Sequence, residues 1–177
     1  AHGIQFSIHV EGPVENVEYS SRITSRLPPP DAEGVHWFQY PGYYPFLKQI
    51  ETCRGRRIFD FHGVTPAGLW ADKELDASHR HVSLAGRADR ILVHSDYMAG
   101  EILAMQDLPR ERVQTLYLGV ETDQFRPGPR DTTLLEMLGM EGQIVLLFVG
   151  RLATNKRIDL LIEALARLPQ QYSLVVA

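Results

Sequence analysis

The chain has 177 residues, which suffices for one domain core or for one domain with part of another. Its 44% hydrophobic and 23% charged residues are ordinary for a globular protein, and its net charge of -4 argues against a protein dominated by nucleic-acid binding. A single cysteine, Cys53, excludes an internal disulfide and a cysteine-based metal cluster, and no apolar run approaches the roughly 20 residues that span a bilayer.

Short apolar runs alternate with helical patterns, which predicts an α/β protein with a parallel sheet. In the first part of the chain we expect strands at residues 4–10, 34–38, 57–61, 91–93 and 113–118. A helical, charge-rich stretch covers residues 70–87. Ser95 is suited to cap a second helix over residues 96–106.

Two prolines and a glycine within residues 126–131 indicate a domain boundary. We therefore divide the chain into residues 1–128 and 129–177. The second part is expected to hold a helix at 132–138, a strand at 144–149, a helix at about 155–168 and a strand at 172–176. So few elements cannot bury both faces of a sheet, and we expect this part to be unstable or partly disordered alone.

A cationic segment follows the apolar strand 144–149. Gly150 lets the backbone turn or a ligand approach, and Thr154 or Asn155 could cap the next helix. Arg151, Lys156 and Arg157 then surround the helix start, and the resulting repulsion would be relieved by an anion such as a diphosphate. Solvated surface cations without a ligand are the alternative interpretation.

Four segments, in order, resemble the retaining glycosyltransferases of family 4, which have the GT-B architecture. They are Phe61-His62-Gly63, residues 88–95, residues 118–127, and Val149-Gly150-Arg151-Leu152 with Lys156 five residues after the arginine. Together they cover roughly positions 57–176. The resemblance implies a Rossmann-like acceptor-side domain followed by the incomplete start of a second Rossmann-like domain that binds a nucleotide sugar.

The resemblance also implies roles for individual residues. Gly150, Arg151 and Lys156 would bind the donor, and the two cations would neutralise charge that develops on the leaving diphosphate. His62 would lie at the cleft near the donor sugar and the acceptor. No metal and no cofactor are expected, because these enzymes usually need none. We expect a cytoplasmic location, with peripheral association at the inner membrane face left open.

The sequence departs from the family in several places. Glu121 stands where aspartate is frequent, and Arg157 stands where glycine often follows the lysine. Neither the glutamate pair that grips the donor nor the Gly-rich loop after the first strand is visible. The resemblance therefore implies a fragment of a larger enzyme, inactive alone.

Several residues have a structural interpretation as well as a functional one. His62 could be a packed core histidine, and we interpret Asp60 as structural or edge-facing. The aromatic loop at residues 36–45 could form an acceptor platform through His36, Tyr40 and Tyr43, or it could pack against the core. His79 and His81 point to different sides of a helix, so no metal site is predicted there.

The function expected from the resemblance is transfer of a sugar from a nucleotide-sugar donor to an acceptor, with retained anomeric configuration. The acceptor could be a sugar, a lipid, a small molecule or a protein. A nucleotide-sugar epimerase or phosphorylase of the same architecture, or a non-catalytic homologue, is the alternative.

Overall fold

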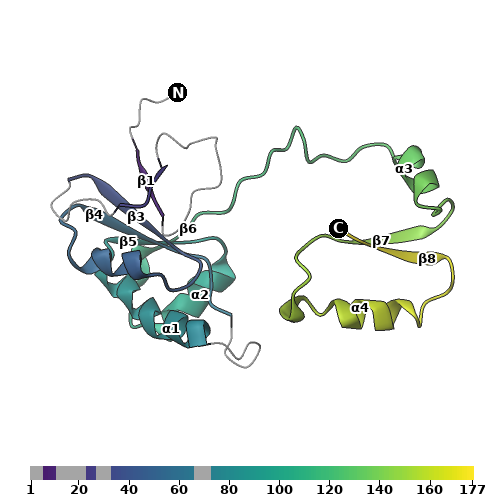
Figure 1. The fold of residues 1–177 in the computed structure, drawn as a ribbon. Helices are drawn as coiled ribbons and strands as arrows, with labels where there is room; N and C mark the ends of the chain where they lie inside the picture. The colour runs from purple at the N-terminus through teal and green to yellow at the C-terminus, as the bar shows by residue number, and fades with distance from the viewer. Residues whose placement is uncertain (1–5, 11–22, 27–32, 66–72) are drawn as a thin grey trace. The chain divides into compact units, whose positions relative to one another are not determined.

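The computed structural model describes residues 6–10, 23–26, 33–65 and 73–177, without the side chains of 73–75. The chain divides into two compact units, Ala1–Gly119 and Val120–Ala177 (Figure 1). The division thus follows Gly119, upstream of the boundary predicted after Gly128. Every residue from 116 to 134 is exposed, and helix or strand resumes only at Thr132.

The first unit is built on a parallel sheet of four strands. They are β3 (Val35–Tyr40), β4 (Arg56–Phe61), β5 (Arg90–Val93) and β6 (Val113–Thr115), in the order β3-β4-β5-β6. The strands β1 (Ile8–His9) and β2 (Ile23–Thr24) form a separate parallel pair. Sequence order equals spatial order across the four-stranded sheet, as crossovers of the same hand would produce.

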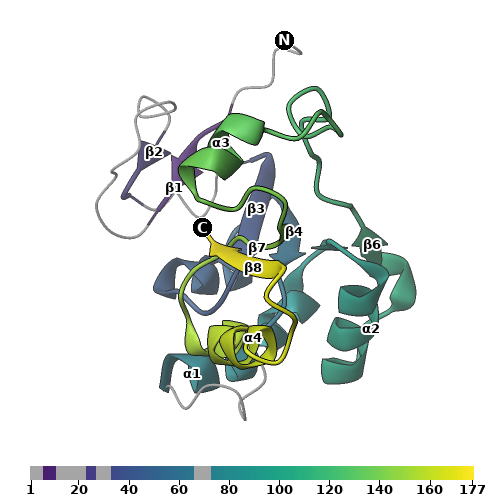
Figure 2. The same cartoon turned by 90° about the vertical axis from the view of Figure 1, so that its right-hand side faces the viewer.

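Helical segments connect these strands. The helix α1 (Lys73–His81) continues into a 3₁₀ segment at Val82–Arg87, and α2 (Asp96–Met105) follows β5. Shorter 3₁₀ segments lie at Pro45–Glu51 and Arg110–Arg112. Ser95 caps α2 as predicted, because its side chain accepts a hydrogen bond from the Met98 amide. In both views α1 and α2 lie on the same side of β3 and β4 (Figures 1 and 2).

The core lies on one face of this sheet. Alternate residues of the strands point to the same face, so Phe38, Phe59, Ile91 and Val113, which are neighbours in register, form one buried row. The core is completed by side chains from the connecting segments, among them Leu47, Ile50, Val82, Ala85 and Ile102. On the opposite face, Val35 and Trp37 are largely exposed, whereas Asp60 is only 2% exposed.

The second unit contains α3 (Thr132–Met137), β7 (Ile144–Phe148), a 3₁₀ turn at Thr154–Lys156, α4 (Ile158–Leu165) and β8 (Tyr172–Val176). The strands β7 and β8 pair in parallel. All hydrophobic side chains that are buried in the described part of the chain belong to residues 38–113, so this unit contributes none. It has a sheet without a core.

These elements confirm the predicted α/β class and most predicted elements, although the first predicted strand is a strand only at Ile8–His9 among the described residues 6–10. Residues 4–5 of the first predicted strand and 70–72 of the first predicted helix lie outside the described residues. The helix predicted from about 155 begins only at Ile158, because Arg157 has a left-handed backbone. None of the helices that the structure describes has the length and apolar character needed to cross a bilayer.

Candidate functional site

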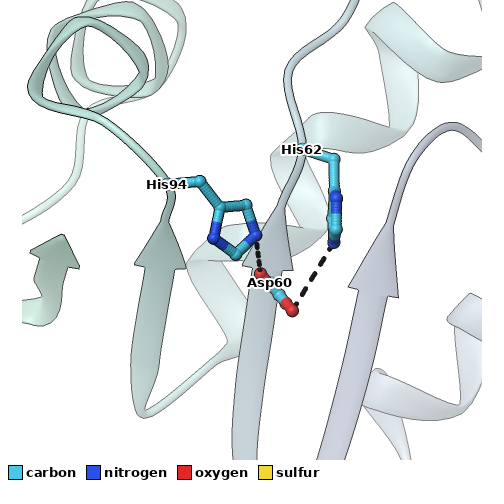
Figure 3. A group of neighbouring side chains, drawn as sticks. All are labelled: Asp60, His62 and His94. Carbon is cyan, nitrogen blue, oxygen red and sulfur yellow. Dashed lines mark ion pairs between the residues drawn. The ribbon is translucent and has the colours of Figure 1, made fainter. Parts of the chain in front are cut away.

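Asp60, His62 and His94 meet at the carboxyl end of the four-stranded sheet (Figure 3). Asp60 lies near the end of β4, and His62 follows that strand on the same face, because side chains alternate. His94 directly follows β5, one step beyond the register pair Phe61 and Val93, which places it beside His62. The carboxyl ends of parallel strands are where ligands bind in open α/β sheets.

The two histidine rings lie on either side of the Asp60 carboxylate (Figure 3). Nε2 of His94 lies 2.9 Å from one carboxylate oxygen, and Nε2 of His62 lies 3.5 Å from the other. The indole Nε1 of Trp37 donates a hydrogen bond of 2.8 Å to Asp60 Oδ2. The far nitrogen of His94, Nδ1, lies 3.0 Å from the backbone oxygen of Leu116.

Solvent reaches this cluster from the side of His62. The side chains of Asp60 and His94 are 3% and 9% exposed, whereas that of His62 is 34% exposed. The His62 amide donates to the Tyr40 carbonyl at 3.1 Å, so the sheet ladder holds its backbone. Gly63 then turns the chain at φ 86°, a value that glycine adopts without strain. His62 therefore combines a fixed backbone with an accessible imidazole in front of a buried carboxylate.

The second predicted site lies in the other unit, between β7 and α4. Gly150 continues the β7 ladder by donating from its amide to the Ala177 carbonyl at 3.0 Å. Arg151 and Lys156 are both exposed, and neither side chain forms an ion pair with any residue that the structure describes. An open pocket of about 350 Å³ adjoins them and is lined by Leu152, Ala153, Thr154, Arg157, Ile158 and Asp159.

The predicted helix start at this site requires a correction. Neither Thr154 nor Asn155 caps α4; both lie in the preceding 3₁₀ turn. Arg157 occupies the cap position, and its guanidinium donates to the Asp159 carboxylate at 2.8 Å. This hydrogen bond lowers the pKa of Asp159 below its usual range. Arg157 is therefore paired with Asp159, whereas Arg151 and Lys156 form no ion pair with the residues that the structure describes.

Among the predicted acceptor-side residues, Tyr40 is a core residue, contrary to its predicted place. It is fully buried, its ring lies 4.9 Å from that of Phe59, and its hydroxyl donates to the Ser78 carbonyl. Burial raises the pKa of this phenol. No face of the ring is left for a sugar.

The other two predicted acceptor-side residues lie at different ends of β3. His36 lies near the amino end of that strand, in register with Arg57, and therefore away from His62. Tyr43 follows the carboxyl end of β3, and its partly exposed ring stacks on His81 at 4.0 Å. Of these two, only Tyr43 lies at the end of the sheet that carries His62.

Sequence reasoning assigned no role to His94 and Trp37, and it interpreted Asp60 as structural. A signal for the cluster was present in the spacing. Asp60 and His62 are two residues apart at the end of one strand, and His94 directly ends the next. In a parallel sheet this pattern places all three at one edge and on one face.

The sequence of the chain is similar to curated glycosyltransferases. It is 33% identical over 82 residues to the D-inositol 3-phosphate glycosyltransferase of Mycolicibacterium smegmatis. The matched segment covers 46% of this chain and 19% of that protein. It is 36% identical over 86 residues to the enzyme of the same name from Thermobifida fusca. This matched segment covers 49% of the chain and 20% of that enzyme. The chain is related to these glycosyltransferases. It matches about a fifth of their length, and no family model matches it.

Solved structures support the fold. Anabaena HepE in complex with UDP and glucose superposes with a TM-score of 0.62 at 21% sequence identity, covering 73% of this chain and 35% of that one. The complex of HepE with UDP-glucose gives a TM-score of 0.61 with the same identity and coverage. The predicted α/β fold class and the predicted resemblance to glycosyltransferases are therefore confirmed.

Proposed function

We propose that the protein to which this chain belongs transfers a sugar from a nucleotide-sugar donor to an acceptor, with retention of anomeric configuration. The observation that carries the proposal is the sequence similarity to enzymes named as glycosyltransferases. A fold shared with a protein that binds UDP and UDP-glucose supports a nucleotide-sugar donor. Because the chain matches only part of its relatives, the activity is assigned to the whole protein.

The proposed donor site uses the two free cations after β7. With Asp159 holding Arg157, the side chains of Arg151 and Lys156 are the cations left to meet a diphosphate. A guanidinium can bind two phosphate oxygens at once, and an ammonium acts as a point charge. Both would stabilise the leaving diphosphate as the glycosidic bond breaks, which is electrostatic catalysis without a metal. Gly150 lets the donor approach the backbone at this strand end.

The proposed role of His62 is to contact the donor sugar or the acceptor. Its imidazole is the accessible member of the cluster at the carboxyl end of β4. The buried Asp60 carboxylate lies behind it, with Oδ2 3.5 Å from the His62 Nε2. Tyr43 is the predicted acceptor-side residue at this same end of the sheet, so we keep it as an acceptor contact.

The first prediction concerns Arg151→Ala and Lys156→Ala in the complete protein. Each should lower kcat/KM by roughly a hundredfold or more, because loss of one preorganised charge contact in a transition state costs about 3 kcal/mol. Steady-state transfer from UDP-glucose to D-inositol 3-phosphate is the first assay, since the relatives' names and the HepE complexes suggest these substrates.

The matched control is Arg167→Ala, which removes an exposed arginine after the far end of α4 and should leave kcat/KM unchanged. Wild-type turnover in either test variant would refute the donor assignment. Detection of an isomerised donor or a sugar phosphate, in place of an acceptor-linked sugar, would refute transfer itself.

A further inference from the structure

We propose that Trp37 and Asp60 are positioning residues for His62: the indole fixes the Asp60 carboxylate, and the carboxylate fixes the imidazole with its proton on Nε2. The other ring nitrogen, Nδ1, is then left with a lone pair that accepts a hydrogen bond from a sugar hydroxyl. The contact with a sugar rests on the proposed function, whereas the arrangement of the three side chains rests on their geometry alone.

The Asp60 carboxylate is held from the neighbouring strand. Trp37 of β3 lies on the same face of the sheet as Asp60, and its indole Nε1 donates a hydrogen bond of 2.8 Å to Oδ2. Among the described residues no other side chain makes an aligned hydrogen bond to Asp60, since Oδ1 lacks such a partner although His94 Nε2 lies 2.9 Å away. The carboxylate is only 3% exposed, so Trp37 is the group that fixes its direction.

The charge of this carboxylate selects the protonation site of His62. Oδ2 of Asp60 lies 3.5 Å from Nε2, which is an ion-pair distance and is longer than an ordinary hydrogen bond. At that distance the negative oxygen repels a lone pair on Nε2 and attracts an N–H, so the neutral ring carries its proton on Nε2. Contacts of this kind are often long in ligand-free sites and tighten when the ligand binds.

The remaining contacts of His62 restrict the ring and leave one nitrogen for a ligand. Its ring meets that of His94 edge to face, with 4.7 Å between the centroids, and its amide donates to the Tyr40 carbonyl (Figure 3). In the part of the chain that the structure describes, Nδ1 has no hydrogen-bond partner, and the side chain is 34% exposed. Nδ1 is therefore the ring nitrogen left for a ligand.

The tautomer decides which ligand group His62 contacts. A nitrogen with a lone pair accepts a hydrogen bond and a sugar hydroxyl donates one, so the two are complementary. A deprotonated phosphate oxygen only accepts, and it would find no proton on Nδ1. We therefore expect His62 to contact a hydroxyl of the donor sugar or of the acceptor, and the diphosphate to lie with Arg151 and Lys156.

Positioning is tested on the 177-residue chain by NMR, without donor or acceptor. Carbon relaxation of the imidazole C–H groups gives the order parameter of the His62 ring. Long-range proton–nitrogen spectra at pH 8, where an unperturbed imidazole is neutral, give its tautomer, and His62→Gln assigns the signals. We expect the proton on Nε2 and an order parameter near the rigid value of about 0.85 in the wild type, falling below about 0.6 in Trp37→Phe.

Val35→Ala is the matched control for this comparison. Val35 lies two residues before Trp37 on the same face of β3, is 64% exposed, and is in register with Arg56, away from Asp60. The order parameter of the His62 ring in this variant should equal that of the wild type. A His62 ring equally ordered in the wild type and in Trp37→Phe would overturn the proposal, as would a proton on Nδ1 in the wild type.

A double-mutant cycle in the complete protein tests whether Trp37 acts through His62. Trp37→Phe alone should lower kcat for transfer from UDP-glucose about tenfold and leave the KM for UDP-glucose unchanged, because a loosened ring misplaces a contact of the transition state. In the His62→Gln background the same substitution should have no further effect. Equal losses of kcat in the two backgrounds would contradict a role through His62.

Failure of this proposal is distinguishable from failure of the proposed function. A wild-type protein that transfers no sugar would refute the transferase function, and the NMR comparison would still decide the positioning of His62. Normal transfer by the wild type together with normal kcat in His62→Gln would overturn the sugar contact while leaving the transferase function in place.

Discussion

Arg157 occupies a backbone position that ordinarily suits glycine. Its φ and ψ are 48° and 46°, in the left-handed region, where the Cβ of most residues crowds the following carbonyl. Among the described residues it is the only non-glycine with positive φ. The family that the chain resembles often has glycine at this position, and the geometry explains that preference. The contact with Asp159 partly offsets the strain.

We therefore predict that Arg157→Gly slows amide hydrogen exchange in α4 or leaves it unchanged. Glycine relieves the backbone strain, whereas the lost ion pair is exposed and contributes little. Arg157→Ala is the control, because it loses the same ion pair and keeps the Cβ, so its exchange should stay near the wild-type rate or become slightly faster, and faster than in Arg157→Gly. Equal protection in the two variants would show that strain at this position is negligible.

Only some residues of the candidate sites could be predicted from the sequence. His62, Arg151 and Lys156 could be proposed because each belongs to a short segment with a family resemblance. His94 and Trp37 could not, because their roles depend on which strands are neighbours and in which register. Tyr40 was misplaced because an aromatic loop and the end of a buried strand can have the same composition, and Tyr40 is the last residue of β3.

Strands β4 and β5 are joined by a contact at their amino ends. The Asp89 carboxylate accepts a hydrogen bond of 2.7 Å from the Arg57 amide, and Nε of Arg57 lies 3.5 Å from the same oxygen. The backbone hydrogen bond from Arg57 lowers the pKa of Asp89. This carboxylate therefore stabilises the start of the strand pair whose other end carries the histidine cluster.

We predict that Asp89→Asn lowers the free energy of unfolding at pH 7 by about 1 kcal/mol or less, because partial exposure screens the charge. A lowered folded-state pKa means that the wild-type contribution is present above the unfolded value of about 3.9 and is lost as the pH falls below it. Urea unfolding followed by tryptophan fluorescence gives the free energy of unfolding of the wild type and of Asp89→Asn at pH 7 and at pH 3.

The difference in the free energy of unfolding between the wild type and Asp89→Asn should be smaller at pH 3 than at pH 7. Asp107→Asn, which changes an exposed aspartate after α2, should show no such difference at either pH. A gap between wild type and Asp89→Asn that is as large at pH 3 as at pH 7 would contradict the assignment.

The elements themselves were largely predictable, because apolar runs for strands and caps such as Ser95 are local signals. The start of α4 was not, since a run of polar residues at 154–157 can continue a helix as easily as a 3₁₀ turn. The end of β6 was extended too far for a related reason. Leu116 and Leu118 look like strand residues, yet both are largely exposed.

At the scale of the whole molecule, the two units differ in how much apolar surface they bury. The first has a continuous core beneath its sheet. In the second, the successive residues Leu146 and Leu147 of β7 point to opposite faces, and both are exposed, by 39% and 65%. Exposed leucines on both faces are typical of a strand whose sheet needs layers on two sides.

The predicted instability of residues 131–177 follows from this difference. In the 177-residue chain we expect amides of β7 and β8 to exchange far faster than those of β4 and β5, because little apolar burial opposes local opening. Hydrogen exchange read by mass spectrometry on peptides from both units measures the contrast. Cooperative unfolding of the second unit with protection equal to that of the first would contradict it.

Successive side chains of β4 point to opposite faces of the sheet, and this limits which insertions or deletions the strand can tolerate. Phe59 and Phe61 belong to the core, and Asp60 between them belongs to the histidine cluster. One residue gained or lost within this strand would exchange the two faces, placing the carboxylate among hydrocarbon side chains and the phenylalanines at the ligand edge. Residues 120–131, which are exposed throughout, can change length without such an exchange. Among natural variants of this chain, length differences should therefore collect in that segment and be absent from β4.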